Sequence, residues 1–137
     1  MKTSGEYVFK KNQEGRLEFV GDFNGYYKND DDPWGQSATD ISMAPYYKKS
    51  RARTHDLAKA TCTQRLLIVG CGAGYTMKNY QIGDPEAIVG MDISGKAIQK
   101  AQALFPEFRY IKGDIMNRGV TNKIGINSFE TVILEQI

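Results

Sequence analysis

The stretch LLIVGCGAGYTM, residues 66–77, joins a short apolar run to a loop that has a glycine at every second position. Four consecutive aliphatic residues are typical of a strand that is covered on both faces of a parallel sheet. Gly70, Gly72 and Gly74 carry no side chains at the point where the chain must turn sharply into a helix. The stretch therefore predicts a strand, a loop and a helix, with loop backbone that a ligand can approach closely.

The rest of the second half continues this alternation of strands and helices. The expected strands cover residues 65–69, 87–92, 108–111 and 129–134, and the expected helices between them cover residues 73–80 and 95–104. Such alternation indicates an α/β fold with a doubly wound, mostly parallel sheet of about four core strands. A further helix is expected to begin near Met43 and to end before Thr61.

The first 49 residues form an N-terminal extension that is rich in aromatic residues. The runs at 7–9 and 17–20 contain β-prone residues on either side of a polar segment, and together they predict a β-hairpin. Residues 29–35, NDDDPWG, predict a loop. Because so many aromatic side chains need cover, we expect the extension, residues 1–49, to lie over an α/β domain at residues 50–137.

Composition excludes several classes of protein. The 137-residue chain suffices for one core, and its 18 basic and 16 acidic residues give a net charge of +2, too small to favour nucleic acid as a partner. No apolar run is long enough to span a membrane, and the first residues lack the apolar segment of a signal peptide. A cytoplasmic location is the expectation.

Metal and thiol chemistry are not expected. Cys62 and Cys71 are too few for a disulfide framework, and with the single histidine, His55, they do not make a metal site. Cys71 lacks an evident base in the sequence to activate it as a nucleophile. It is therefore interpreted as a small residue packed in the turn.

Two acidic residues follow the second and third expected strands. Asp92 lies about 20 residues beyond the glycine loop, where an acid can accept hydrogen bonds from the hydroxyls of a ribose. Its alternative role is to cap the next helix, which Ser94 can also do, so the spacing favours the ribose role. Asp114 either meets an adenine amino group at the same edge or serves as a turn residue after Gly113.

The glycine spacing also bears on a nicotinamide dinucleotide as the ligand. The dinucleotide fingerprint is G-x-G-x-x-G, and here Tyr75 occupies the position of its third glycine. A bulky side chain at that position is expected to crowd the packing of helix against strand. A nicotinamide-dependent oxidoreductase is therefore a less favoured alternative.

Taken in order, GCGAG, VGMDIS, IKGDI and TVILEQI resemble the motifs of class I S-adenosylmethionine-dependent methyltransferases over residues 64–137. The resemblance implies a Rossmann-like fold that transfers the methyl group of S-adenosylmethionine to a small-molecule acceptor and releases S-adenosylhomocysteine. No Asn-Pro-Pro-type tetrapeptide follows the fourth strand, where the chain reads ILEQ, so a nucleic-acid methyltransferase is disfavoured.

The resemblance also implies roles for the loop and for the strand ends. Gly70, Gly72 and Gly74 would line the methionine part of the cofactor, together with Cys71 from the same loop. Asp92 would hold the ribose diol.

Further roles follow for residues beyond the second and third strands. Ile93 would pack on the adenine face, and Asp114 would meet the adenine amino group beside the backbone of Ile115. Glu135 and Gln136 would border the methyl donor and acceptor, with Glu135 as the candidate catalytic base and His55 as its alternative.

The resemblance implies two more elements of the site. The helix before the first strand would supply a basic residue to the cofactor carboxylate, Arg51 or Arg53, with Tyr46 or Tyr47 beside it. The aromatic extension would form a lid or an acceptor wall.

The family fold has seven strands in the order 3-2-1-4-5-7-6, whereas this sequence ends at Ile137, at or just after the fourth. We therefore expect either a piece of a longer protein or a sheet completed by a partner. That partner would be a second copy or a complementing C-terminal segment, paired along strand 129–134. The alternative to an enzyme is accordingly a non-catalytic module that binds the cofactor or a partner without turnover.

Overall fold

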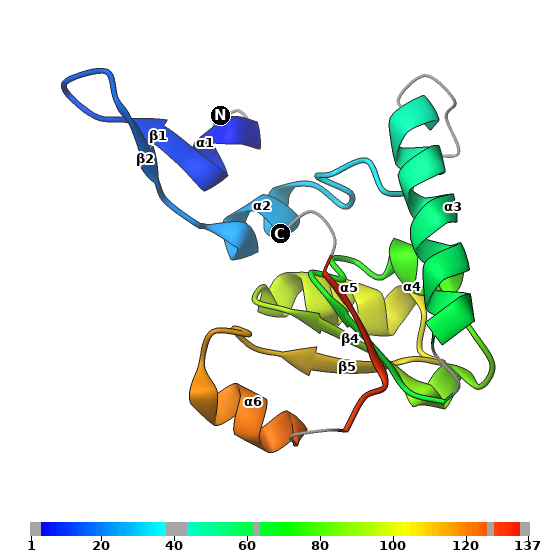
Figure 1. The fold of residues 1–137 in the computed structure, drawn as a ribbon. Helices are drawn as coiled ribbons and strands as arrows, with labels where there is room; N and C mark the ends of the chain where they lie inside the picture. Colours follow the sequence, from blue (N-terminus) through cyan, green and yellow to red (C-terminus); the bar gives the residue numbers. More distant parts are fainter. Residues whose placement is uncertain (1–3, 38–43, 62–63, 126–127, 135–137) are drawn as a thin grey trace.

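The computed structural model describes residues 4–37, 44–61, 64–125 and 128–134. Figure 1 shows a sheet with helices packed around it and an N-terminal hairpin that projects away from this body. The side chains of Ser4 and of residues 44–47 are outside the description.

Four parallel strands form the centre of the fold. They are β3 (Leu66–Val69), β4 (Ile88–Asp92), β5 (Arg109–Lys112) and β6 (Thr131–Leu134), and they lie in the order β5-β4-β3-β6. All three neighbouring pairs are parallel. The expected α/β fold with a parallel sheet of four strands is confirmed.

The strand register brings the loops that follow β3, β4 and β5 to one edge of the sheet. Val69 at the end of β3 pairs with Met91, and Asp92 at the end of β4 pairs with Lys112 at the end of β5. Because the strands are parallel and end together, the glycine loop and Asp92 are neighbours.

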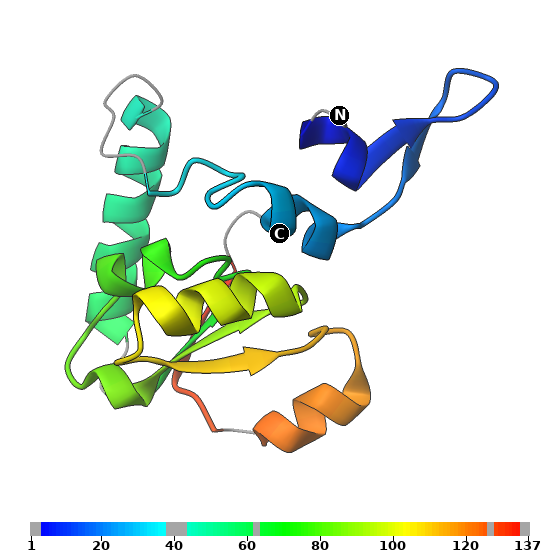
Figure 2. The ribbon, with the colours of Figure 1, turned by 180° about the vertical axis from the view of Figure 1, so that it is seen from behind.

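Helices cover both faces of the sheet (Figures 1 and 2). On one face, α3 (Ala44–Thr61), α4 (Tyr75–Asn79) and α5 (Gly95–Leu104) contribute to a core with Leu66, Ile68, Ile88 and Ile133. On the other face, α6 (Arg118–Ile124) packs on Leu67, Val69, Val89 and Met91. Alternate residues of β3 and β4 thus point to opposite cores, which explains why β3, and β4 up to Met91, carry no polar side chain.

The expected hairpin is confirmed, with shorter strands than the sequence indicated. Strand β1 (Phe9–Lys11) pairs antiparallel with β2 (Leu17–Phe19), and Phe9 lies opposite Phe19. The expectation that Tyr7 and Val8 are extended is wrong, since both belong to helix α1 (Ser4–Val8). The Tyr7 ring stacks on the ring of Tyr26, with the two centroids 5.6 Å apart. Tyr7 in α1 thus packs against a residue outside the hairpin.

Besides α1, three short helical segments were not predicted: α2 (Phe23–Asn29), the turn η2 (Pro85–Ala87) and α6. Each begins at a side chain that accepts a hydrogen bond from the first turn, namely Asp22, Asp84 and Asn117. Such caps stabilise helices that are too short to show an apolar periodicity in the sequence. Helix α3 runs through the boundary expected between residues 49 and 50.

Strand β6 departs from the pattern of its neighbours. Its apolar sequence predicts burial on both faces, but Val132 and Leu134 are 49% and 63% exposed, and only Ile133 is buried. Among the described residues β6 pairs with β3 alone. No helix in the described ranges is both long and apolar enough to cross a membrane.

Gly90 in β4 provides a test of how tightly this core is packed. A Cβ atom at Gly90 would lie 2.9 Å from both the Cys71 and the Met77 sulfur atoms, which belong to fully buried residues. We expect Gly90→Ala to lower the free energy of unfolding by about 1–3 kcal/mol, because two fully buried side chains must shift to admit the added Cβ. Urea unfolding measures the change.

The matched control is Gly95→Ala at the start of α5, where the nearest atom, Lys112 Cδ, lies 3.4 Å from the added Cβ, an ordinary contact. Equal stability of the Gly90 variant and the control would contradict this account of the core.

Candidate functional site

The glycine loop after β3 is shaped by three residues in left-handed backbone conformations. Gly70, Gly72 and Gly74 have φ angles of 78°, 56° and 89°. The amides of Gly70 and Cys71 both donate to the Met91 carbonyl, at 2.8 and 3.0 Å. The loop is thereby fixed to the end of β4.

Gly74 allows two helices to approach each other. A Cβ atom there would lie 3.0 Å from the Phe105 ring, 3.1 Å from Ala101 Cβ and 3.2 Å from the Tyr110 hydroxyl. Gly74 thus lies close to α5 and to β5, and the Tyr75 ring packs edge-on against Phe105, with ring centroids 5.5 Å apart. The cofactor role expected of Gly74 stays a prediction.

Asp92 connects the loop to the neighbouring strand. Its Oδ2 accepts a hydrogen bond from the Gly72 amide at 2.9 Å, and its Oδ1 accepts one from the Ser94 amide at 2.8 Å. Each carboxylate oxygen can accept a further bond, since an ionised carboxylate offers about four acceptor positions. Asp92 can therefore hold the loop and still receive two hydroxyl donors.

The environment of Asp92 opposes its ionisation. Burial raises the pKa of the carboxyl group above its ordinary value, while the amides of Ser94 and Gly72 act in the opposite direction. The alternative role of Asp92 as a helix cap is filled by Ser94, whose Oγ accepts from the Ala97 amide at 3.1 Å.

The residues expected around an adenine follow β4 and β5. Ile93 is 49% exposed, next to Asp92. The Gly113 amide donates to the Asp92 carbonyl at 2.9 Å, which ties the chain before Asp114 to the end of β4. Asp114 is exposed and accepts from the Met116 amide at 2.8 Å, and the half-buried Ile115 packs beneath α6. The structure thus brings Asp92 and the segment at Asp114 to one edge.

Two residues from the N-terminal extension lie against the loop and were missed by the sequence analysis. A Cβ atom on Gly72 would lie 2.5 Å from the Tyr27 hydroxyl and 3.1 Å from Gln36 Oε1. Tyr27 is 3% exposed and shares a small core with Ala73 and Ala97. Burial, with the charge of Asp92 as the second cause, raises the pKa of the Tyr27 hydroxyl well above its ordinary range.

Helix α3 was expected to contribute basic and tyrosine side chains to the cofactor site, and only some of these side chains are described. Arg51 is half-buried and its Nη1 donates to the Gln36 carbonyl at 3.4 Å, so it touches a residue that lies against Gly72. Arg53 is exposed. His55 Nδ1 lies 3.6 Å from the carboxylate of its neighbour Asp56, in the same helix.

Several expected residues fall outside the described part of the chain. The side chains of Tyr46 and Tyr47 are among them, as are Cys62, Glu135 and Gln136 in their entirety. Their expected roles stay predictions.

The chemistry of Cys71 is restricted by its surroundings. Its side chain is fully buried, and burial, followed by the charge of Asp92, raises the pKa of the thiol strongly. A thiol held neutral in this way is a poor nucleophile, in agreement with the packing role. Within the described ranges no three His, Cys, Asp or Glu residues are placed to hold a metal ion.

Comparison of the sequence with protein-family models and with curated proteins gives no match. A function can therefore be proposed only from the geometry of the loop and of Asp92.

The environment of Asp92 leads to a prediction about its titration. Its carboxyl group should titrate above the ordinary value of 3.8, because burial disfavours its charge. The folded chain then holds this proton more tightly than the unfolded chain, so this group's contribution to stability falls as the pH rises through the raised pKa. Carboxyl ¹³C NMR, assigned with Asp92→Asn, measures the pKa. A value at or below 3.8 would contradict this account.

Proposed function

We propose that this chain binds S-adenosylmethionine through the loop after β3 and the carboxylate after β4, and that it serves methyl transfer to a small-molecule acceptor. The observation that carries the proposal is the hydrogen bond between the Gly72 amide and Asp92 Oδ2. It joins a glycine-rich loop to an acid at the adjacent strand end, the place where parallel α/β sheets bind nucleoside ligands.

The chemical features of the loop and of Asp92 fit an adenosyl ligand. Asp92 retains acceptor capacity for two ribose hydroxyls, and the exposed side chain of Ile93 offers an apolar surface to a base. The exposed carboxylate of Asp114 accepts one amide bond and retains capacity for an exocyclic amino group.

The order of the sheet supports the same proposal. In the family that the motifs resemble, the first four strands lie in the order 3-2-1-4, and the four strands here follow that order as β5-β4-β3-β6. A Rossmann-like fold is the finer assignment that we propose on this basis.

The reaction requires little acid–base chemistry from the protein. S-adenosylmethionine carries a methyl group already activated by its positively charged sulfur. The contribution of the chain is to hold cofactor and acceptor in line and to exclude water. Tyr27 and Gln36 lie against Gly72 and would serve water exclusion. A neutral Tyr27 hydroxyl and a neutral Cys71 thiol would not compete with the acceptor as nucleophiles.

The proposal predicts a selective effect of Asp92 on ligand affinity. Isothermal titration calorimetry should detect S-adenosylmethionine and S-adenosylhomocysteine binding to the chain, with NAD as the weaker comparison ligand. Asp92→Ala should weaken the adenosyl ligands by roughly 10- to 100-fold, the effect of removing hydrogen bonds to a charged group.

The matched control is Asp84→Ala, which removes an exposed carboxylate that caps η2. Circular dichroism of each variant checks the fold. Absence of binding to the folded wild-type chain, or equal affinity of wild type and Asp92→Ala, would contradict the proposal.

A second candidate function rests on the exposed face of β6. Val132 and Leu134 are 49% and 63% exposed on a strand with a partner on one side only among the described residues. Such an edge can pair with another strand. The chain would then be a module that binds cofactor without turnover and completes its sheet with a second copy of itself.

Analytical ultracentrifugation tests this second candidate. The wild-type chain should sediment as a dimer at micromolar concentration. Val132→Lys should sediment as a monomer, because burying a lysine in the interface along β6 is unfavourable. Glu130→Gln, which replaces a carboxylate at the start of the same segment with an uncharged amide of similar size, is the control. A monomeric wild-type chain would exclude the homodimer.

A further inference from the structure

The N-terminal extension covers the glycine loop with one helix. Tyr27 of α2 is buried, and its hydroxyl group lies where a Cβ of Gly72 would be only 2.5 Å away. Its neighbours Ala73 and Ala97 belong to the loop and to α5. Any ligand that approaches the backbone at Gly72 from this side meets Tyr27.

Within the described residues, the segment from Asp22 to Ser37 makes several hydrogen bonds to itself. Asp22 caps α2 through the Gly25 amide at 2.8 Å, and the Tyr26 hydroxyl donates to the Pro33 carbonyl at 3.0 Å. Asp32 accepts from the amides of Gln36 and Ser37.

Aromatic contacts add to this internal bonding. Trp34 packs edge-on against Tyr26 with ring centroids 5.0 Å apart, and its side chain hydrogen-bonds to that of Tyr27. The segment can therefore move as one unit.

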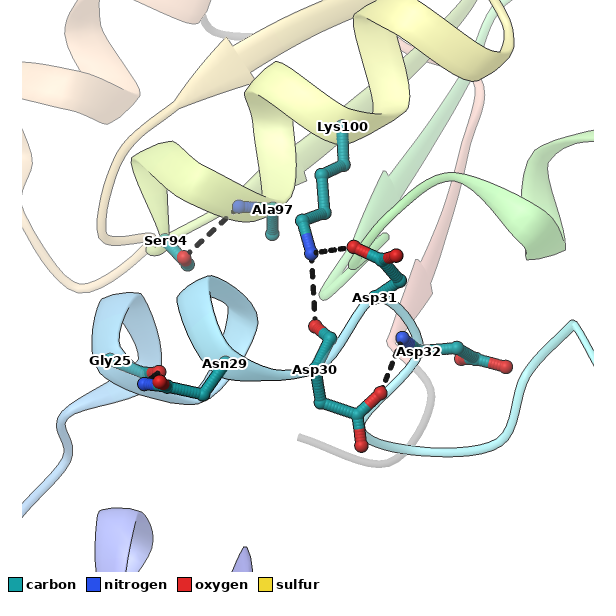
Figure 3. A network of polar contacts seen from close by, with 8 residues as sticks. All are labelled: Gly25, Asn29, Asp30, Asp31, Asp32, Ser94, Ala97 and Lys100. Carbon is teal, nitrogen blue, oxygen red and sulfur yellow. Dashed lines mark hydrogen bonds and ion pairs between the residues drawn. The ribbon is translucent and has the colours of Figure 1, made fainter. Parts of the chain in front are cut away.

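Within the described residues, side chains attach this segment to α3, where Arg51 Nη1 donates to the Gln36 carbonyl at 3.4 Å, and to α5 at two places. Figure 3 shows Lys100 of α5 reaching across to the segment, where its Nζ lies 2.6 Å from Asp31 Oδ1 and 3.0 Å from the Asp30 carbonyl. At the other end of α2, Asn24 Oδ1 accepts from the Ser94 hydroxyl at 2.9 Å and from the Lys96 amide at 3.2 Å.

The distance between Lys100 and Asp31 is short, but an ion pair as exposed as this one contributes little free energy. The Lys100 side chain is 24% exposed, but that of Asp31 is 98% exposed, so water and salt screen the ion pair. The Lys100 ammonium group lowers the pKa of Asp31, so this carboxylate stays ionised at neutral pH. A contact of this kind holds a segment in place and can be broken by thermal motion.

The resemblance to methyltransferases already implies a lid formed by the aromatic extension. We propose that residues Asp22–Ser37 are the part that covers the glycine loop, and that Lys100 is the latch that sets how often this part opens to admit a ligand. The proposal rests on the proposed function for the identity of the ligand. The covering of Gly72 by Tyr27 and the contact of Lys100 with Asp30 and Asp31 are independent of that identity.

The test begins with the ligand-free chain, in which Trp34 is the single tryptophan. Lys100→Met removes the charge and preserves most of the side chain's length. It should increase the population of the open lid by roughly 1.5- to 5-fold, the range expected for an exposed ion pair. Hydrogen exchange of the α2 amides and acrylamide quenching of Trp34 fluorescence should rise together.

The matched control is Lys96→Met, one turn earlier on α5, where Nζ bonds to Gln99 and not to the lid. Asp31→Asn should change both readouts in the same direction but by less than Lys100→Met, because the bond from Lys100 to the Asp30 carbonyl remains. The double variant should match Lys100→Met, because that change already removes both contacts. Unchanged exchange and quenching in Lys100→Met relative to Lys96→Met would overturn the proposal without reference to any ligand.

Stopped-flow binding of S-adenosylhomocysteine supplies the second readout. The association rate constant should rise in Lys100→Met by the same factor as the open population. A more open lid with an unchanged association rate constant would overturn gating. A more open lid with no binding in any variant would support the latch and overturn the proposed function instead.

Discussion

The hydrogen bond from the Gly72 amide to Asp92 is the constraint on which the candidate site depends. It can form only because β3 and β4 are parallel, adjacent and in register to their ends, with Val69 opposite Met91. The two further amides that bond to the Met91 carbonyl fix the loop from its other end. Glycine is needed at Gly72 for its left-handed φ of 56° and for the space that Tyr27 and Gln36 occupy.

The same arrangement accounts for the electrostatics of the site. Burial first, and the charge of the half-buried Asp92 second, disfavour ionisation of the Tyr27 hydroxyl and the Cys71 thiol. The charge of Asp92 is opposed by burial and supported by the backbone amides of Ser94, Gly72 and Ile93. The two carboxylate oxygens act here as hydrogen-bond acceptors, each from one backbone amide, and in the proposal they also accept from ribose hydroxyls.

Local patterns in the sequence predicted the four strands and α5, because continuous apolar runs and a helical stripe are set by burial on the two faces of the sheet. They also placed Asp92 beside the loop, since a strand end and its register determine that position. Helix α2 was not predicted, because the stability of this seven-residue helix depends on the Asp22 cap and on the burial of Tyr26 and Tyr27.

The contact of Tyr27 with Gly72 could not be read from a single sequence, because it joins residues 45 positions apart through packing of the extension. In the local sequence, only the adjacent residues Tyr26 and Tyr27, which follow the capping residue Asp22, indicated such a contact. The exposure of Val132 and Leu134 could not be foreseen either, since it depends on what lies beside β6 and not on the strand's own sequence.

The most direct test of the central claim is an NMR titration of S-adenosylhomocysteine into the ¹⁵N-labelled chain. The account predicts that the amide resonances of Gly72 and Ser94, both bonded to Asp92, shift on binding, together with the Trp34 indole resonance of the lid. Binding that leaves the Gly72 and Ser94 resonances unchanged, or no binding by the folded chain, would contradict it.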